Sequence, residues 1–213
     1  NDFHPITLKW DVHPERDEEW FNKETRNMSR TSVAQEYECN FLSSGETVID
    51  PKDLKRIATI LEAPEYRTGF DRNFWIWENY KQEEKYLITA DVARGDGKDS
   101  SAFHVIKLTT MEIVAEYKGV LSLDMFSKLL NQIGREYGSC LMVVENIGVG
   151  IAVLEKLIDF EYPNLYYSIK GSQEYIDPLQ AQYHSNAVPG FTTSVKTRPL
   201  VVAKLEEYIR HNI

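Results

Sequence analysis

The order of hydrophobic segments between residues 86 and 144 restricts the fold more than any other feature of the sequence. Apolar residues at helical spacing run from Leu123 to Tyr137, and the short, wholly apolar run CLMVV that follows is typical of a buried parallel strand. Before them stand three β-type runs joined by short loops, which predict an antiparallel meander: YLITADV (86–92), SAFHVIKL (101–108) and EIVAEYKG (112–119). We therefore predict an α/β fold with a mixed central sheet, three antiparallel strands and then parallel strands, flanked by helices.

The segments before residue 61 are predicted to be helical. One helix is expected to begin near Pro14, one at Ser32 with a capping box, and one at Pro51 with Asp50 as its N-cap. We interpret residues 1–60 as a helical N-terminal segment and residues 61–213 as the main domain.

After Glu145 the pattern predicts a helix at GVGIAVLEKLIDF, a further strand of the sheet at LYYSI and a last helix from Thr197. Residues 171–196 show little periodicity, and a stretch of this length inside a compact domain is usually functional or mobile.

Composition limits the classes of partner. The net charge of −9 argues against a generally basic surface, but it does not exclude a local basic groove that binds nucleic acid. No apolar run approaches the roughly 20 residues of a membrane-spanning helix, so we expect no membrane partner. The two cysteines, Cys39 and Cys140, match no zinc or redox spacing and are expected to be reduced core residues of a cytoplasmic protein.

Two acidic residues stand where two apolar strands end. Asp91 follows YLITA and Glu145 follows CLMVV, so the two carboxylates meet at one edge of the sheet if these strands are neighbours. Carboxylates held that close resist joint ionisation, and a divalent cation such as Mg²⁺ or Mn²⁺ relieves the repulsion. Two such ions can activate a water and stabilise the leaving oxygen in phosphodiester cleavage. The alternative is that each acid only forms a turn or caps a helix.

The loop after Asp91 carries further acids. Asp99 either folds back toward Asp91 as a metal ligand or caps the turn into the next strand, and Asp96 fits a turn residue. The RGDGK sequence of this loop lacks the spacing of a P-loop and joins two strands, so it predicts no nucleotide binding.

Four stretches carry a resemblance to a known family: HPERDEEW, QEYECNFLSSGETVID, ITADVARGDGKDSSAFHVI and MVVENIGVG. Together they resemble the C-terminal nuclease half of the large terminase subunit of tailed bacteriophages, most closely its T-even-like branch. The resemblance implies an RNase H-like fold and a metal-dependent endonuclease that cuts concatemeric double-stranded DNA when genome packaging starts and ends. It also implies an N-terminal ATPase domain of the same polypeptide, which this chain lacks and which residues 1–60 would join.

The resemblance also assigns roles to individual residues. Asp91 matches the first catalytic acid of the family and Glu145 the second, and an acid equivalent to Asp99 is often found in the first loop. The third catalytic acid of the family would lie beyond Ile213, since neither Asp159 nor Asp177 stands where the pattern requires it. With the third acid present, the site is expected to hold two Mg²⁺ or Mn²⁺ ions.

DNA contacts require cations near the acidic edge. The candidates are Arg94, Lys98, Lys170, Lys196 and Arg198, although each is also an ordinary exposed residue by type. The aromatic run FWIWENY could form a binding surface, but its spacing fits a core strand or a packing flap more simply.

The resemblance further implies partners and a location. The partners are the ATPase domain, the portal ring of the procapsid and the small terminase subunit, and the location is the host cytoplasm with transient binding at the portal vertex. Two alternatives stay open: another RNase H-like nuclease of the resolvase or integrase type, or a non-catalytic docking module for the portal.

Overall fold

The predicted meander and the apolar run after it form the centre of one sheet in a computed structural model, which describes residues 8–26, 28, 32–33, 36–39, 48–172 and 174–212. Contacts divide the chain into two units, one of residues 1–61 and 199–213 and one of residues 62–198. Most of the last helix belongs to the first of these units, and the domain boundary near residue 61 stays a prediction.

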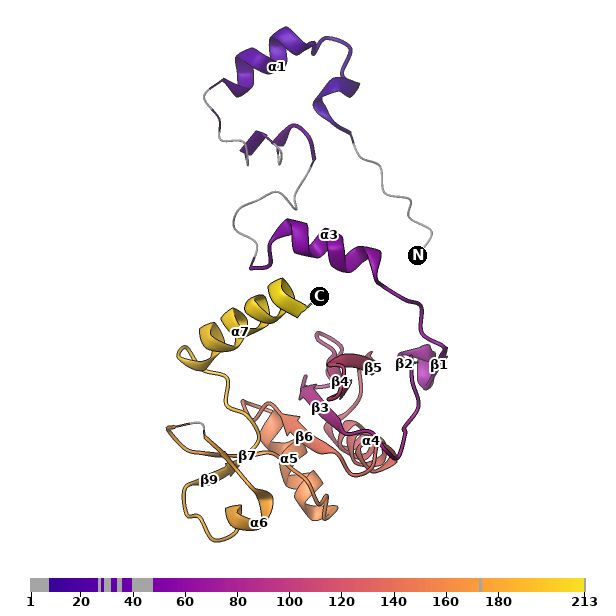
Figure 1. Cartoon of the computed structure of the whole chain (residues 1–213), viewed down its shortest axis with the longest axis vertical. Coiled ribbons are helices and arrows are strands. Elements are labelled where there is room, and N and C mark those ends of the chain that lie inside the picture. The colour runs from indigo at the N-terminus through magenta and orange to yellow at the C-terminus, as the bar shows by residue number, and fades with distance from the viewer. Residues whose placement is uncertain are drawn as a thin grey trace. The chain divides into compact units, whose positions relative to one another are not determined.

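The unit of residues 62–198 is built on a six-stranded sheet with the order β1-β2-β5-β4-β3-β6 (Figure 1). As predicted, β3, β4 and β5 pair antiparallel in sequence, and β6 joins β3 in parallel. Two further strands extend the sheet beyond β5 in antiparallel pairing. The strands are β1 (Tyr66–Thr68), β2 (Phe74–Ile76), β3 (Tyr86–Asp91), β4 (Ser101–Lys107), β5 (Glu112–Gly119) and β6 (Leu141–Val144).

The hydrophobic core lies between one face of this sheet and the helices α4 (Leu123–Glu136) and α5 (Gly150–Asp159). Alternate residues of β3 and β4 are buried on that face, and Ile88 and Phe103 are completely shielded from solvent. Phe126 and Leu130 of α4 pack into the same cluster at the helical spacing read from the sequence. This packing fixes the strands whose ends carry the candidate site.

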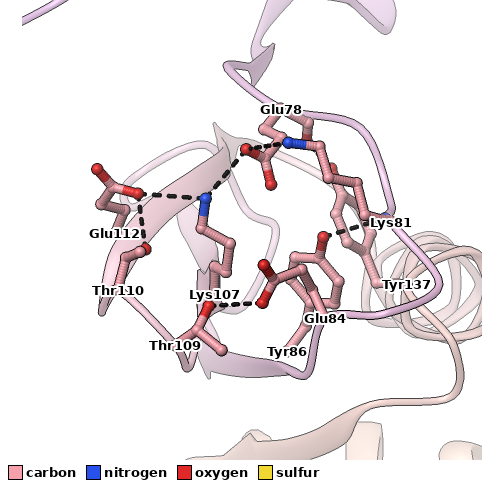
Figure 2. A network of polar contacts seen from close by, with 9 residues as sticks. All are labelled: Glu78, Lys81, Glu84, Tyr86, Lys107, Thr109, Thr110, Glu112 and Tyr137. Atoms are coloured by element: carbon pink, nitrogen blue, oxygen red, sulfur yellow. Dashed lines mark hydrogen bonds and ion pairs between the residues drawn. The ribbon is translucent and has the colours of Figure 1, made fainter.

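An ion-pair network closes the end of the sheet away from Asp91 (Figure 2). Lys107, at the end of β4, is 9% exposed, and its ammonium nitrogen lies 3.0 Å from Glu78 Oε2 and 3.3 Å from Glu112 Oε2. Lys81 pairs with the same Glu78 oxygen at 2.9 Å, and the Tyr137 hydroxyl donates to the Glu78 carbonyl at 2.8 Å. The network therefore ties the segment after β2 to the β4–β5 hairpin and to α4.

The predicted strand at LYYSI differs from the expectation. Leu165 makes one parallel bridge to Met142 of β6, but the chain then leaves the main sheet. A second sheet with the order β8-β7-β9 forms instead, because the backbone groups of β7 are taken by β8 and β9. Its elements, with the short helix α6, are β7 (Tyr167–Ile169), β8 (Tyr175–Ile176), α6 (Pro178–Ala181) and β9 (Ala187–Pro189).

The other unit is helical in its described part and contains α1 (Glu18–Thr25), α3 (Pro51–Thr59) and most of α7 (Thr197–Asn212). Helix α1 begins at Glu18 and not near Pro14, because Asp17 is its N-cap and accepts the Trp20 N–H at 2.7 Å. Asp50 caps α3 as predicted. The helix predicted from Ser32 lies partly outside the described residues.

Two of the composition-based expectations can be compared with this structure. Both cysteines are free thiols, Cys140 buried as expected and Cys39 only half-buried. None of the described helices has the length and apolarity needed to span a membrane.

Candidate functional site

Two carboxylates meet where β3 and β6 end. The parallel register pairs Ala90 with Val144, so that Asp91, the last residue of β3, and Glu145, the residue after β6, follow at the same edge of the sheet. The Glu145 N–H donates to the Ala90 carbonyl at 3.0 Å and continues the ladder to this point. The structure thus brings together the two acids that the sequence singled out.

The electrostatics of Asp91 reflect this proximity. Partial burial raises the pKa of Asp91, and the Glu145 carboxyl raises it further through a hydrogen bond and through its charge. Asp99 adds a weaker repulsion, and the Val92 N–H acts in the opposite direction. Within the described residues, no lysine or arginine forms an ion pair with Asp91. A cation placed between the two carboxylates would remove it.

Buried Ser101 holds the loop that follows Asp91. Ser101 is 1% exposed, and its hydroxyl oxygen accepts the Ala93 N–H at 3.0 Å. Further along the loop, Gly95 has φ +75°, and a Cβ there would lie 2.3 Å from the Leu121 carbonyl oxygen. Only glycine fits this position, so the loop follows one path over the start of α4.

Asp96 and Asp99 differ in their local roles. Asp96 accepts the Lys98 N–H at 3.1 Å, the arrangement of the turn residue that the sequence predicts. Asp99 accepts the Ser100 N–H at 2.8 Å, yet its charge also reaches Asp91. Asp99 is therefore both a turn residue and a neighbour of the acid pair, and its role as a metal ligand stays a prediction.

The turn after Glu145 depends on a close backbone approach. A Cβ on Gly150, the first residue of α5, would lie 1.9 Å from the Glu145 carbonyl oxygen, a distance that no side chain tolerates. Gly148 has φ +58° but open space around it. Gly150 therefore lets α5 begin directly behind Glu145.

On its other side, Glu145 is held by the chain after β9. The Phe191 N–H donates to the Val144 carbonyl, the Asn146 N–H donates to the Phe191 carbonyl, each at 2.9 Å, and Phe191 bridges Glu145 in parallel. The Asn146 side chain donates to the Pro189 carbonyl, also at 2.9 Å. Sequence reasoning missed Asn146 and Phe191. The only signal was the long aperiodic stretch, residues 171–196, which proves to supply this support.

A cavity of about 460 Å³ adjoins the acid pair between the β3–β4 loop and the turn into α5. Arg94, Lys98 and Asp99 line it from the first loop, and Ile147 and Val149 line it from the second. The cavity is thus charged on one wall and apolar on the other. Its two cations are the predicted DNA contacts that lie beside the site.

The other predicted cations are exposed and lie on other segments. Lys170 follows β7, whereas Lys196 and Arg198 stand at the start of α7. Within the described residues, no carboxylate forms an ion pair with any of the five predicted DNA-binding cations.

The two acids that the sequence considered as substitutes for the third ligand have other positions. Asp177 caps α6 by accepting the Leu179 N–H at 2.9 Å. Asp159 ends α5, at the opposite end of that helix from Glu145.

The donor set fits a divalent cation in part. Carboxylate oxygens are the ligands that Mg²⁺ and Mn²⁺ prefer, and the repulsion at Asp91 shows that a cation would be favoured there. However, the described residues contain no group of three or more His, Cys, Asp or Glu side chains arranged to hold a metal. The described residues thus supply two carboxylates to the site, and the third acid stays a prediction.

Comparison with known proteins places these residues in a family context. No protein-family model matches the chain. The large terminase subunit of Thermus virus P23-45 is 30% identical over 150 residues, which are 70% of this chain and 28% of that protein. The large terminase subunit of Thermus phage G20c is 29% identical over a stretch of the same length. The chain is related to the large terminase subunits. It spans less than a third of the length of these relatives.

Solved structures agree with this relationship at the level of the fold. The large terminase nuclease of thermophilic phage G20c with bound magnesium matches with a TM-score of 0.55 and 18% identity, over 75% of this chain and 70% of that one. The same nuclease with bound zinc matches with a TM-score of 0.52 and 18% identity, over 76% of this chain and 78% of that one. The fold is therefore that of terminase nuclease domains, which is RNase H-like, as predicted. The resemblance to the T-even-like branch in particular stays a prediction.

Proposed function

We propose that this chain is the nuclease domain of a phage large terminase subunit and cuts concatemeric double-stranded DNA when packaging starts and ends. The observation that carries the proposal is the repulsive contact of Asp91 and Glu145 at the ends of two neighbouring parallel strands. The relationship to terminases supports it, and so does the likeness to a terminase nuclease that was crystallised with magnesium, cobalt and zinc.

Asp91 and Glu145 are the residues that would hold a divalent cation, Mg²⁺ or Mn²⁺ in our proposal, with Asp99 as a further ligand. Such an ion supplies Lewis-acid polarisation of a phosphoryl oxygen and lowers the pKa of a bound water. The chain itself positions the acids, through the ladder to Ala90 on one side and the Phe191 bridge on the other. A third carboxylate, expected beyond Ile213, would complete a site for two ions.

The cavity beside the acids gives the DNA backbone a place to lie. Arg94 and Lys98 are exposed in its wall, and within the described residues neither forms an ion pair with a carboxylate. Cations of this kind bind phosphate without reading sequence, which suits an enzyme that cuts wherever packaging ends. Lys170, Lys196 and Arg198 would extend the contact to flanking phosphates.

The proposed partners follow from the same relationship. They are double-stranded DNA, an ATPase domain on the same polypeptide, the small terminase subunit and the portal ring of the procapsid. The protein would act in the host cytoplasm and, during packaging, at the portal vertex.

The deciding experiment is plasmid nicking with Mg²⁺ or Mn²⁺, using the 213-residue chain and a version that continues past Ile213. Asp91→Asn should lower the rate by more than about 100-fold, since even outer-shell partners of metal ligands contribute about 10- to 100-fold. Asp96→Asn is the matched control, because it removes a carboxylate from the same loop and keeps the side-chain oxygen that accepts the Lys98 N–H. Asp99→Asn then decides between a ligand and a turn residue.

Two results would point to the alternatives. If Asp91→Asn cleaves like the unaltered protein, the assignment of the acid pair is wrong and the portal-docking role gains support. If branched DNA is cut much faster than linear DNA, the activity is that of a resolvase.

A further inference from the structure

A second cavity lies away from the acid pair. It measures about 720 Å³ and is formed by β1, β2, β5 and the short helix Phe70–Arg72 that joins β1 to β2. Strand β1 is at the opposite edge of the main sheet from β6, which carries Glu145. The candidate nuclease site makes no use of this cavity.

A cation–π contact between Arg67 and Trp75 forms one wall of the cavity. The Arg67 guanidinium lies 3.8 Å from the centre of the Trp75 ring, and both residues line the cavity. The Trp75 indole N–H donates to the Arg72 carbonyl at 3.1 Å, which fixes the ring. Phe74 and Ile76 on either side are buried in the core, so Trp75 faces the other side of the sheet. A guanidinium placed over an aromatic ring is a surface on which an unpaired nucleobase can stack.

The charges that line the cavity favour binding of a single nucleotide over binding of a long stretch of duplex DNA. Three cations line it, Arg67, Arg72 and Lys118, and none forms an ion pair within the described residues. Three carboxylates also line it, of which Glu116 faces His104 at 3.4 Å. The balance leaves little long-range attraction for a DNA backbone, whereas the unpaired cations can still contact a single phosphate locally.

The segment that frames the cavity adopts an uncommon backbone conformation. Gly69 has φ +81°, and the two residues Asp71 and Arg72 have φ +60° and +53° without being glycine. Left-handed conformations of such residues are strained and occur preferentially at binding sites. Here they bring Asp71 and Arg72 into the lining of the cavity.

We propose that this cavity is a second nucleic-acid site, which binds an unpaired nucleotide of DNA. The base stacks on Arg67 over Trp75, and the phosphate contacts Arg72 and Lys118. An unpaired nucleotide fits because its base faces are open for stacking, whereas those of a duplex are covered by neighbouring base pairs. The site does not depend on the cleavage proposed for Asp91 and Glu145.

The test is fluorescence anisotropy with a labelled oligo(dT), in EDTA so that cleavage plays no part. Trp75→Leu should weaken binding by about 5- to 150-fold, the equivalent of one stacked base. Arg67→Lys keeps the charge and loses the plane, so binding should weaken while the dependence on salt stays the same. Lys118→Gln should reduce the slope of log K against log salt by about 0.7. Lys85→Gln, an exposed lysine outside this cavity, is the control and should change neither.

Two comparisons define the ligand. Trp75→Leu should weaken binding of the single strand and leave binding of the same sequence as a duplex unchanged, because the proposed duplex contacts lie beside Asp91 and Glu145. Free dTMP should compete only at much higher concentration than the oligonucleotide. An equal loss of affinity for duplex and single strand in Trp75→Leu would overturn the proposal, and so would a Trp75→Leu variant that melts normally and binds the single strand like the unaltered chain. Efficient competition by dTMP would make the ligand a free nucleotide and would overturn the assignment to DNA. Plasmid nicking is read separately, so each proposal can fail alone.

Discussion

The two ends of the β3–β4 strand pair differ in whether their carboxylates have a positively charged partner. At one end, Asp91 stands opposite Ala102 and faces Glu145 with no described cation against it. At the other end, Lys107 stands opposite Tyr86 and lies between two glutamates, Glu78 and Glu112 (Figure 2). Both ends thus place two carboxylates together, but only one supplies its own counter-charge.

The pKa directions record this difference. The Lys81 and Lys107 hydrogen bonds lower the pKa of Glu78 against the opposing effect of burial, and the Glu78 contact raises the pKa of Lys107. At Asp91, burial and Glu145 both raise the pKa. Folding favours the charged forms of Glu78 and Lys107, so their ionisation contributes to stability. Folding disfavours the charged form of Asp91, so a cation that binds there would stabilise the folded state. The network therefore stabilises the sheet, and the acid pair is suited to bind a ligand.

The largest predicted effect comes from removing the counter-charge of the network. Lys107→Met should lower the free energy of unfolding at neutral pH by about 3 kcal/mol, because Glu78 would lose its buried partner. One oxygen of Glu78, Oε1, is already buried without a hydrogen-bond partner among the described residues. Urea unfolding measures the change, and Lys81→Met, which removes an exposed partner of the same carboxylate, should cost less than about 1 kcal/mol.

The same network predicts a pH dependence. The pKa of Glu78 is below its ordinary 4.5, so its contribution is present above that value and is lost as the pH falls through the folded pKa. The pKa of Lys107 is above its ordinary 10.5, so its contribution is present below 10.5 and is lost at higher pH. The stability difference between the unaltered chain and Lys107→Met should therefore shrink below pH 4.5. A difference that stays constant through acid would contradict the ionic origin of the effect.

At the acid pair, the largest effect is expected from the backbone behind Glu145. Gly150→Ala should destabilise the protein by roughly 3 kcal/mol, at the upper end of the overpacking range, because a Cβ would lie 1.9 Å from the Glu145 carbonyl oxygen. Gly148→Ala is the matched control two residues earlier, with open space and only a positive φ to disfavour it, and should cost about 1 kcal/mol. Equal effects in thermal unfolding would show that the close approach does not support Glu145.

A cation should reverse the repulsion at the acid pair. Mn²⁺ at about 100 times its Kd should stabilise the unaltered chain by about 2.7 kcal/mol in thermal unfolding, since a ligand of the folded state raises stability by mass action. Asp91→Asn and Glu145→Gln should lose this gain, whereas Asp96→Asn should keep it. A gain of equal size in all four proteins would place the ion elsewhere.

The two ends also differ in how far the sequence could predict them. Asp91 and Glu145 were identifiable because each directly follows an apolar run, so that position along a strand determines position at the sheet edge. The network was not identifiable, because Glu78 lies in a segment without periodicity and meets Lys107 only through the tertiary fold. Phe191 could not be predicted for the same reason: it contacts Glu145 through a backbone bridge that forms only in the tertiary fold and does not depend on its side chain. A strand does form within LYYSI, as predicted, but it belongs to a second sheet and not to the main one. That second sheet depends on β8 and β9, which are too short to be predicted from the sequence pattern.

The smallest predicted effect comes from a substitution that should stabilise the protein, whereas the substitutions of Lys107 and Gly150 should destabilise it. Without metal, Asp91→Asn should stabilise the protein at neutral pH, because it removes an ionised carboxylate that burial and Glu145 disfavour. Since Asp91 is exposed and its repulsion is screened, the gain should stay below about 1 kcal/mol. The pKa of Asp91 in the folded protein lies above the ordinary 3.8. The unaltered chain is therefore most stable, relative to the Asn variant, below pH 3.8, and it loses that stability as the pH rises through the folded pKa of Asp91. The gain of the Asn variant should therefore vanish below about pH 3.8 and grow toward neutrality, as urea unfolding in EDTA would show. A loss of stability at neutral pH would mean that Asp91 makes a favourable contact in the metal-free protein, and the contrast between the two ends of the ladder would no longer hold.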